Sequence, residues 1–385
     1  MLKPSLGICS KTVISTATLS FLIACGGGGT TSDGGAAGSG ASPPAATSYN
    51  YNQGTPSSEA SADQTIVSSA EYSLRYIAPD GTSYDSLADA KKVLNLGGDA
   101  APTIDTNARA AWQQGWTGKN VRVGITDSFN LNGVVDSHGD WVAIVQSSVA
   151  PETTVAMRDV LSSSTLVGLI GNVNSAYDYF EANGYHIINN SWGIERSVRN
   201  SSGAYTGALH SDFDSLVNET VSDFDPNSPS SAQGLYILAG GNAGHYCPTR
   251  RIENCNWIAA VTDKLRNSGY PGGTRLIFVG SLEDSSNNLA DYSYYAGNLQ
   301  SDFVVAHDDV FSHGDAAGTS FAAPRVAGVA ALVKQKFPNL SSAQIKQVLL
   351  QTADDLGATG VDEVFGHGKI NVMNSLSPQG RVVPK

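Results

Sequence analysis

Basic side chains, cysteines and long apolar runs are all scarce in this sequence of 385 residues. Lys and Arg number 23 against 35 Asp and Glu, so the chain carries a formal net charge of −12. Such acidity argues against nucleic-acid binding, which needs a basic surface. An apolar run at residues 12–24 is too short to span a bilayer. No internal repeat is evident, which argues against a repeat array.

The apolar run has the features of a secretory signal, because it follows the basic residues Lys3 and Lys11. It ends in Leu-Ile-Ala-Cys, which resembles the lipobox of bacterial lipoproteins and implies that Cys25 carries the lipid. The alternative is a soluble signal peptide with an incidental cysteine. We expect residues 1–24 to be a lipoprotein signal peptide. The protein would be exported and lipid-anchored to a bacterial membrane, on the periplasmic or surface face of the outer membrane.

The composition then changes twice along the chain. Residues 25–63 are rich in Gly, Ser, Ala, Thr and Pro, and such a segment buries too little apolar surface to order itself. We expect it to be a disordered tether. Residues 64–101 have a globular composition without a catalytic motif, and they are predicted to be an N-terminal extension of unknown role. The main folded domain is expected over residues 102–385.

A serine motif stands near the C-terminal end, where residues 318–324 read Gly-Thr-Ser-Phe-Ala-Ala-Pro before an apolar helical stretch. A serine among small residues at a helix start has an uncrowded hydroxyl, and the helix N-terminus favours a developing oxyanion. A serine nucleophile needs both properties. The motif resembles the nucleophile signature of the subtilisin-like serine proteases, or subtilases, which implies that Ser320 is the nucleophile. The alternative is a closely packed helix start.

Two upstream motifs match the same family. Residues 120–126 alternate like a strand and lead into Asp127, which places this carboxylate at the functional edge of a parallel sheet. Residues 138–143 resemble the family motif His-Gly-x-x-Val-Ala. The order Asp127, His138, Ser320 is that of subtilisin. The resemblance implies that Asp127 orients His138, the general base. Taken singly, the aspartate has an alternative role in a turn and the histidine a structural one.

The resemblance also implies where substrate binds. A buried strand at residues 235–239 runs into an Ala-Gly-Asn-like turn, so Asn242 and the Ser320 backbone N–H would hold the oxyanion. Residues 186–193 resemble the family strand whose exposed backbone pairs with an extended peptide. The implied substrate-binding residues are Ser191, Trp192, Gly193, Ala239, Gly240 and Gly241.

Beyond residue 25 the chain holds one pair of cysteines, Cys247 and Cys255, eight residues apart. In an exported protein the expected outcome is a disulfide, and metal ligation with His245 is the alternative. No cofactor is expected to be required. A structural calcium is common in the family, but no residue can be assigned to it.

A His- and Asp-rich loop precedes the serine motif and contains His307, Asp308, Asp309, His313 and Asp315. It offers both imidazole and carboxylate groups, and these suit different metals. We therefore prefer a solvated loop over a metal site, and we assign no metal ligand.

Alternating strand and helix patterns predict the fold class. They indicate an α/β, doubly wound, mostly parallel sheet of about seven strands with helices on both faces. Expected strands beyond those above lie at residues 153–160, 257–262, 276–280 and 303–306. Expected helices lie at residues 167–182, 213–221 and 344–352, the last opened by a capping box at Ser341.

The function expected from the resemblance is that of a secreted, lipid-anchored serine endopeptidase acting on proteins or peptides, monomeric by default. The alternatives are a catalytically silent binding or scaffold module on the same fold, and an esterase. The resemblance is closest to autotransporter-type subtilases, here as a lipoprotein for which no translocating β-barrel is expected. The chain departs from the family in the short spacing between Asp127 and His138, which we expect to reshape one side of the cleft.

Overall fold

The structure is a computed structural model, and it describes Gly54 and residues 74–77, 83–85, 106–129, 137–163, 165–200, 204–222, 234–269, 275–283, 286–308 and 317–378. The predicted signal peptide, Cys25 and nearly all of the predicted tether lie outside these residues. Within the described part of the chain, no helix combines the length and the apolar character needed to cross a bilayer.

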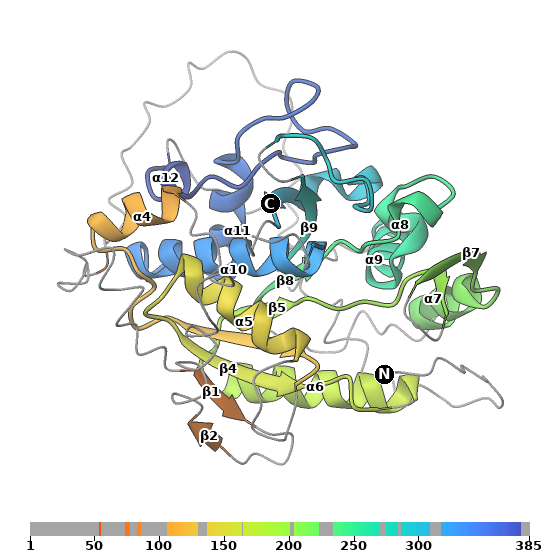
Figure 1. The fold of residues 1–385 in the computed structure, drawn as a ribbon, viewed down its shortest axis with the longest axis horizontal. Coiled ribbons are helices and arrows are strands. Elements are labelled where there is room, and N and C mark those ends of the chain that lie inside the picture. Colours follow the sequence, from red (N-terminus) through yellow and green to blue (C-terminus); the bar gives the residue numbers. More distant parts are fainter. Residues whose placement is uncertain are drawn as a thin grey trace, which may run out of the picture.

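An eight-stranded sheet in the order β10-β9-β8-β5-β3-β4-β1-β2 forms the centre of the molecule (Figure 1). Every neighbouring pair is parallel except β1 with β2. The predicted mostly parallel α/β sheet is therefore confirmed, with one strand more than expected. The strands are β1 (Leu74–Ile77), β2 (Ser83–Asp85), β3 (Arg122–Asp127), β4 (Thr154–Asp159), β5 (Ile187–Asn190), β8 (Leu235–Ala239), β9 (Leu276–Leu282) and β10 (Phe303–His307).

The two strands at one end of the sheet come from the segment predicted to be an N-terminal extension. Strand β1 pairs in parallel with β4, with Leu74 opposite Val155, and β2 pairs antiparallel with β1. A separate two-stranded hairpin consists of β6 (Ser197–Arg199) and β7 (Tyr205–Leu209). Residues 74–77 and 83–85 of the predicted extension thus supply one edge of the main sheet.

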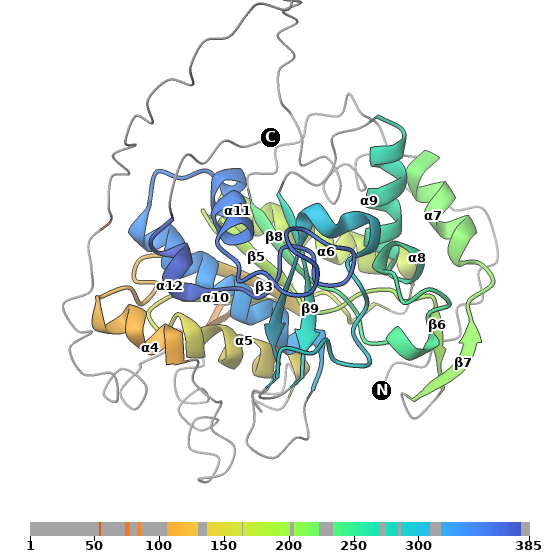
Figure 2. The ribbon, with the colours of Figure 1, turned by 90° about the horizontal axis from the view of Figure 1, so that it is seen from above.

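Helices cover both faces of the sheet. One face carries α4 (Thr106–Gln113), α5 (His138–Val149), α10 (Thr319–Lys336), α11 (Ser342–Gln351) and α12 (Val372–Ser375). The other face carries α6 (Leu166–Ala182), α7 (Phe213–Ser222), α8 (Ile252–Cys255) and α9 (Trp257–Asn267). Figure 1 shows α5 and α10 across the sheet from α6, and Figure 2 shows α7, α8 and α9 gathered at one end.

A hydrophobic core lies on each face of the sheet, and successive side chains along a strand point alternately into the two cores. In β8, Ile237 packs with the α5 and α10 side, whereas its neighbours Tyr236 and Leu238 pack with the α6 and α9 side. All three side chains are buried. Strands apolar on both faces are what a parallel sheet between two helical layers requires.

One predicted strand is wrong, because residues 257–262 form the first half of the helix α9. The side chain of Asn256 accepts the backbone N–H of Ala259 and caps the helix start. Trp257, Val261 and Leu265 then recur every fourth residue and are all buried. The aromatic and β-branched content suggested a strand, but this helical spacing and the cap decide the outcome. The predicted capping box of α11, made by Ser341 and Gln344, is confirmed.

Candidate active site

The carboxyl edge of the sheet brings the predicted catalytic residues to one region. Asp127 is the last residue of β3, His138 is the first residue of α5, and Ser320 lies in the first turn of α10. Ser137 caps α5 in a capping box with Asp140. The N–H of Gly139 donates to the Ser128 carbonyl at 3.1 Å, which ties the helix start to the end of β3.

Asp127 and His138 are in direct contact. His138 Nδ1 lies 2.7 Å from Asp127 Oδ1, which also accepts the N–H of Ser128 at 2.7 Å. Burial raises the pKa of the Asp127 carboxyl above its usual range, against the opposing effect of the bond to His138. Burial lowers the pKa of His138, but the hydrogen bond and charge of Asp127 outweigh it, so the pKa is raised overall. A bond at Nδ1 leaves Nε2 available as a base.

Ser320 is tied to the segment that follows β5. Its hydroxyl donates to the Ser191 carbonyl at 3.0 Å, and the Ser191 hydroxyl donates to the Ser320 carbonyl at 2.8 Å. The ring of the next residue, Phe321, lies 5.6 Å from the His138 ring between centroids. No hydrogen bond links Ser320 to His138 among the described contacts, so the serine hydroxyl must rotate away from Ser191 to reach the imidazole. Such catalytic bonds are often unmade before substrate binds.

The side chain of Asn242 is held in one orientation. Its Oδ1 accepts both the N–H and the hydroxyl of Thr319, each at 2.9 Å. The Thr319 hydroxyl oxygen in turn accepts the N–H of Gly241 at 3.0 Å. Because Oδ1 accepts both bonds from Thr319, the amide is oriented with its donor Nδ2 on the opposite side. A Cβ at Gly318 would lie 3.2 Å from Nδ2, so this close approach favours glycine.

A cavity of about 240 Å³ lies beside these groups. Of the predicted substrate-binding residues, all but Gly240 line it. Gly240 is buried behind the wall, where its carbonyl accepts the side-chain N–H of Asn256 at 3.1 Å. The lining consists of Ser191, Trp192, Gly193, Glu195, Arg199, Ala239, Gly241, Asn242, Asn256, Thr319 and Ser320.

The indole of Trp192 has a fixed place in this cavity, because its N–H donates to the Thr126 hydroxyl at 3.0 Å. Thr126 also donates to the side chain of Asn190 at the end of β5. The ends of β3 and β5 therefore hold the ring, and no local sequence pattern indicated this contact.

Asp308 corrects the prediction of a solvated loop before the serine motif. It is 2% exposed, and its carboxylate accepts the N–H of Gly318 at 2.6 Å and the hydroxyl of Tyr292. Buried and hydrogen-bonded, it supports the segment that leads into Ser320. His307 is the last residue of β10, and Asp309, His313 and Asp315 lie outside the described residues. Over the described ranges, no group of three His, Cys, Asp or Glu side chains is placed to hold a metal ion.

Cys247 and Cys255 form the expected disulfide. The carbonyl of Cys255 accepts the N–H of Arg196 at 2.8 Å. The bridged loop therefore supports the segment that runs from the cavity residues Ser191 and Gly193 toward β6.

Residues 125–368 match the Subtilase family. The chain is 25% identical over 350 residues to an extracellular serine protease of Serratia marcescens, a match that covers 70% of this chain and 33% of that protein. The chain thus spans about a third of that relative's length. It is 26% identical over 297 residues to subtilisin BL of Lederbergia lenta, covering 69% and 93%. A crystal structure of MycP1 from Mycobacterium smegmatis aligns with a TM-score of 0.49 at 19% identity, covering 74% and 90%.

Proposed function

Because the chain belongs to the subtilase family, we propose that it is a serine endopeptidase that cleaves proteins or peptides through an acyl-enzyme on Ser320. The observation that carries this proposal is the 2.7 Å bond between Asp127 and His138, formed at the sheet edge where α10 presents Ser320. A base oriented by a carboxylate and a serine at a helix N-terminus are the parts that acyl transfer requires.

The proposed first step is attack by Ser320 Oγ on the scissile carbonyl carbon. The hydroxyl turns from the Ser191 carbonyl to His138, whose Nε2 takes the proton. Asp127 keeps the imidazole in the tautomer with hydrogen on Nδ1 and stabilises the imidazolium that forms. Asn242 Nδ2 and the Ser320 N–H then donate to the oxyanion at the N-terminus of α10.

Collapse of the tetrahedral intermediate breaks the C–N bond, and His138 returns its proton to the leaving amine. Water, deprotonated by the same imidazole, then hydrolyses the ester on Ser320 and regenerates the hydroxyl. The segment Ser191–Gly193 lines the cavity beside the nucleophile, where its backbone would pair with an extended substrate chain. That pairing supports a peptide substrate.

A fluorophosphonate probe tests the assignment of the nucleophile. We expect the probe to label the wild-type protein and the control variant Ser268→Ala, whose serine caps the far end of α9. Ser320→Ala should remain unlabelled and should lose about 10⁶-fold in turnover, the loss known for the corresponding serine of subtilisin. Equal labelling of wild type and Ser320→Ala would exclude Ser320 as the nucleophile.

We also propose that the protein is exported and anchored through a lipid on Cys25. The basic and apolar N-terminal segment supports this proposal, as does the extracellular location named for the Serratia relatives. A clickable palmitate analogue should label the wild type and Cys9→Ser, whose cysteine lies inside the signal, but not Cys25→Ser. Persistent labelling of Cys25→Ser would contradict the anchor.

A further inference from the structure

A largely buried carboxylate with no assigned role, Glu195, lines the cavity that holds Ser320 and Asn242. Its side chain is 12% exposed. Oε1 accepts the backbone N–H of Asn242 at 2.6 Å and has a longer contact, 3.5 Å, with the hydroxyl of Tyr294. Oε2 accepts the hydroxyl of Tyr205 and lies 3.5 Å from Nη2 of Arg199. Both oxygens are therefore engaged by the protein itself.

The groups around this carboxylate hold it in place. Burial raises the pKa values of Tyr205 and Tyr294, and the negative charge of Glu195 raises them further, so both phenols remain donors at any ordinary pH. The Arg199 guanidinium lies 3.9 Å above the Tyr205 ring and supplies a positive charge beside Oε2. A largely enclosed carboxylate with this set of partners is held in one geometry.

The backbone at Glu195 is also anchored. Glu195 forms an antiparallel bridge with Asn256. On either side, the Ile194 carbonyl and the Arg196 N–H are hydrogen-bonded to the backbone of residues 255–257, at 2.9 and 2.8 Å. The disulfide loop and the start of α9 thus hold the segment that carries the carboxylate.

The turn that carries Asn242 packs directly against the carboxylate. Gly241 has a φ of +118°, and a Cβ there would lie 2.8 Å from Glu195 Oε1 and 2.5 Å from the Tyr294 ring. A residue with a side chain would displace the carboxylate or the turn. The peptide of Asn242 is therefore held by Glu195, while its side chain is held by Thr319.

We propose that Glu195 is a positioning residue for the oxyanion hole, which acts by fixing the Asn242 backbone so that Nδ2 faces the reacting carbonyl. This inference rests on the proposed peptidase function. Donors that are oriented before the reaction stabilise a developing oxyanion most strongly. Loss of the carboxylate releases the Asn242 N–H and lets the turn move, and a small misplacement of a catalytic group lowers turnover steeply.

Steady-state kinetics on a peptide substrate test this role. We expect Glu195→Ala to lower kcat about 10-fold to 100-fold with little change in KM. Glu195→Gln should lose less, because its amide oxygen still accepts the Asn242 N–H. In an Asn242→Ala background the further loss from Glu195→Ala should disappear, because the group that Glu195 positions is gone.

Two kinetic results would overturn the proposal. One is a double variant whose losses multiply, which would show that Glu195 does not act through Asn242. The other is an effect confined to KM and to substrates with a basic side chain at the cleaved bond, which would make Glu195 a substrate contact. The matched control is Glu181→Gln, since Glu181 also accepts a tyrosine hydroxyl, that of Tyr236 at 2.5 Å, but does not line the cavity.

Hydrogen exchange measured by mass spectrometry tests the same role without turnover. The segment 240–243 should exchange faster in Glu195→Ala than in the wild type, and at the wild-type rate in Glu181→Gln. Unchanged exchange in Glu195→Ala would overturn the proposal. If the wild-type protein cleaves no peptide, the proposed function fails while the exchange result still decides whether Glu195 fixes the turn.

Discussion

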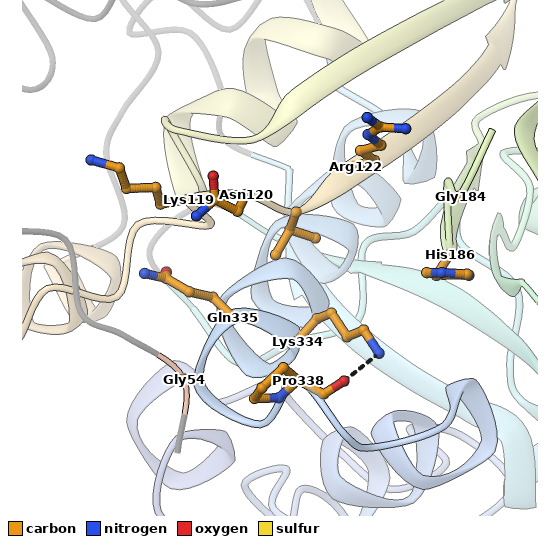
Figure 3. Close-up of a pocket in the computed structure, with 10 residues that line it drawn as sticks. Gly54, Lys119, Asn120, Arg122, Gly184, His186, Lys334, Gln335 and Pro338 are labelled. Atoms are coloured by element: carbon orange, nitrogen blue, oxygen red, sulfur yellow. Dashed lines mark hydrogen bonds between the residues drawn. The ribbon is translucent and has the colours of Figure 1, made fainter. Parts of the chain in front are cut away.

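The two edges of the sheet each carry a cavity, and the larger one is not the candidate active site. The cavity at the carboxyl edge measures about 240 Å³ and holds Ser320 and Asn242. The cavity at the amino edge measures about 540 Å³ and is rich in basic groups (Figure 3). Its lining consists of Gly54, Lys119, Asn120, Val121, Arg122, Gly184, His186, Lys334, Gln335 and Pro338.

The direction of the helices explains why basic groups gather at the amino edge and the candidate active site lies at the carboxyl edge. In a parallel α/β sheet the helices start at the carboxyl edge of the strands and end at the amino edge. Helix N-termini favour developing negative charge, whereas helix C-termini favour cations. At the amino edge Arg122 donates to the carbonyl of Asn183, the C-cap of α6, at 2.6 Å. Lys334 donates to the carbonyls of Pro338 and Leu340, just beyond α10, at 2.9 and 3.0 Å. These cations have structural partners.

A histidine at each edge shows the same contrast. Partial burial lowers the pKa of His186 at the amino edge, and the charge of Lys334 lowers it further, against the smaller opposing effect of Glu181. His138 at the carboxyl edge has Asp127 as its partner, and its pKa is raised. A carboxylate beside the imidazole orients it and stabilises its charged form, whereas a lysine does neither. The partner carboxylate therefore favours His138 as the proposed base, whereas cavity size alone would point to the amino edge.

Replacing each of the two histidines singly by alanine should give the largest difference in turnover between the two edges. His138→Ala removes the proposed base, and we expect turnover to fall by about 10⁶, as for the corresponding histidine of subtilisin. His186→Ala removes an imidazole that forms no hydrogen bond or ion pair with a carboxylate among its described contacts, and turnover should stay within about twofold. Initial rates on a casein or peptide substrate measure both. A comparable loss in both variants would remove the distinction between the two edges.

The pH dependence should follow the Asp127–His138 pair. Because the pKa of His138 is raised and the base must be neutral, kcat/KM should fall tenfold per pH unit below a midpoint that lies above about 6.5. Asp127→Asn removes the charge that raises this pKa. It should therefore move the acid limb to lower pH and reduce turnover about 10⁴-fold. His186→Ala is the control and should leave the midpoint in place. An acid limb that is unmoved in Asp127→Asn would contradict the pairing.

The positions predicted from the sequence are those that lie in local motifs. Asp127, His138, Asn242 and Ser320 each stand in a short pattern that ties the residue to a strand end or a helix start. The structure places them at those ends and starts. The alternation of strand and helix patterns likewise predicted a mostly parallel sheet with helices on both faces. Local patterns therefore account for the sheet and for the candidate catalytic residues.

What the sequence did not reveal depends on contacts between distant segments. Glu195 is 47 residues from Asn242, and Thr319 is 77 residues from it. Neither contact can be predicted from a local sequence pattern, because the two partners are far apart in the chain. The same holds for β1, which pairs with β4 although 74–77 and 154–159 are far apart in the chain. Asp308 was misjudged because an aspartate in a polar stretch usually faces solvent, whereas here two donors compensate its burial.

The smallest expected effect is a loss of stability from a substitution in the basic cavity at the amino edge. Lys334→Met removes the two bonds to carbonyls beyond α10, and we expect it to lower the free energy of unfolding by about 1 kcal/mol and the melting temperature by a few degrees. Lys369→Met, which loses one exposed bond to Asn287, should stay within about 0.5 kcal/mol. Both variants should keep wild-type kcat, because neither side chain lines the cavity that holds Ser320. If Lys334→Met lowered kcat while the melting temperature stayed unchanged, the amino-edge cavity would take part in the reaction. The separation of a stabilising edge from a reactive edge would then be wrong.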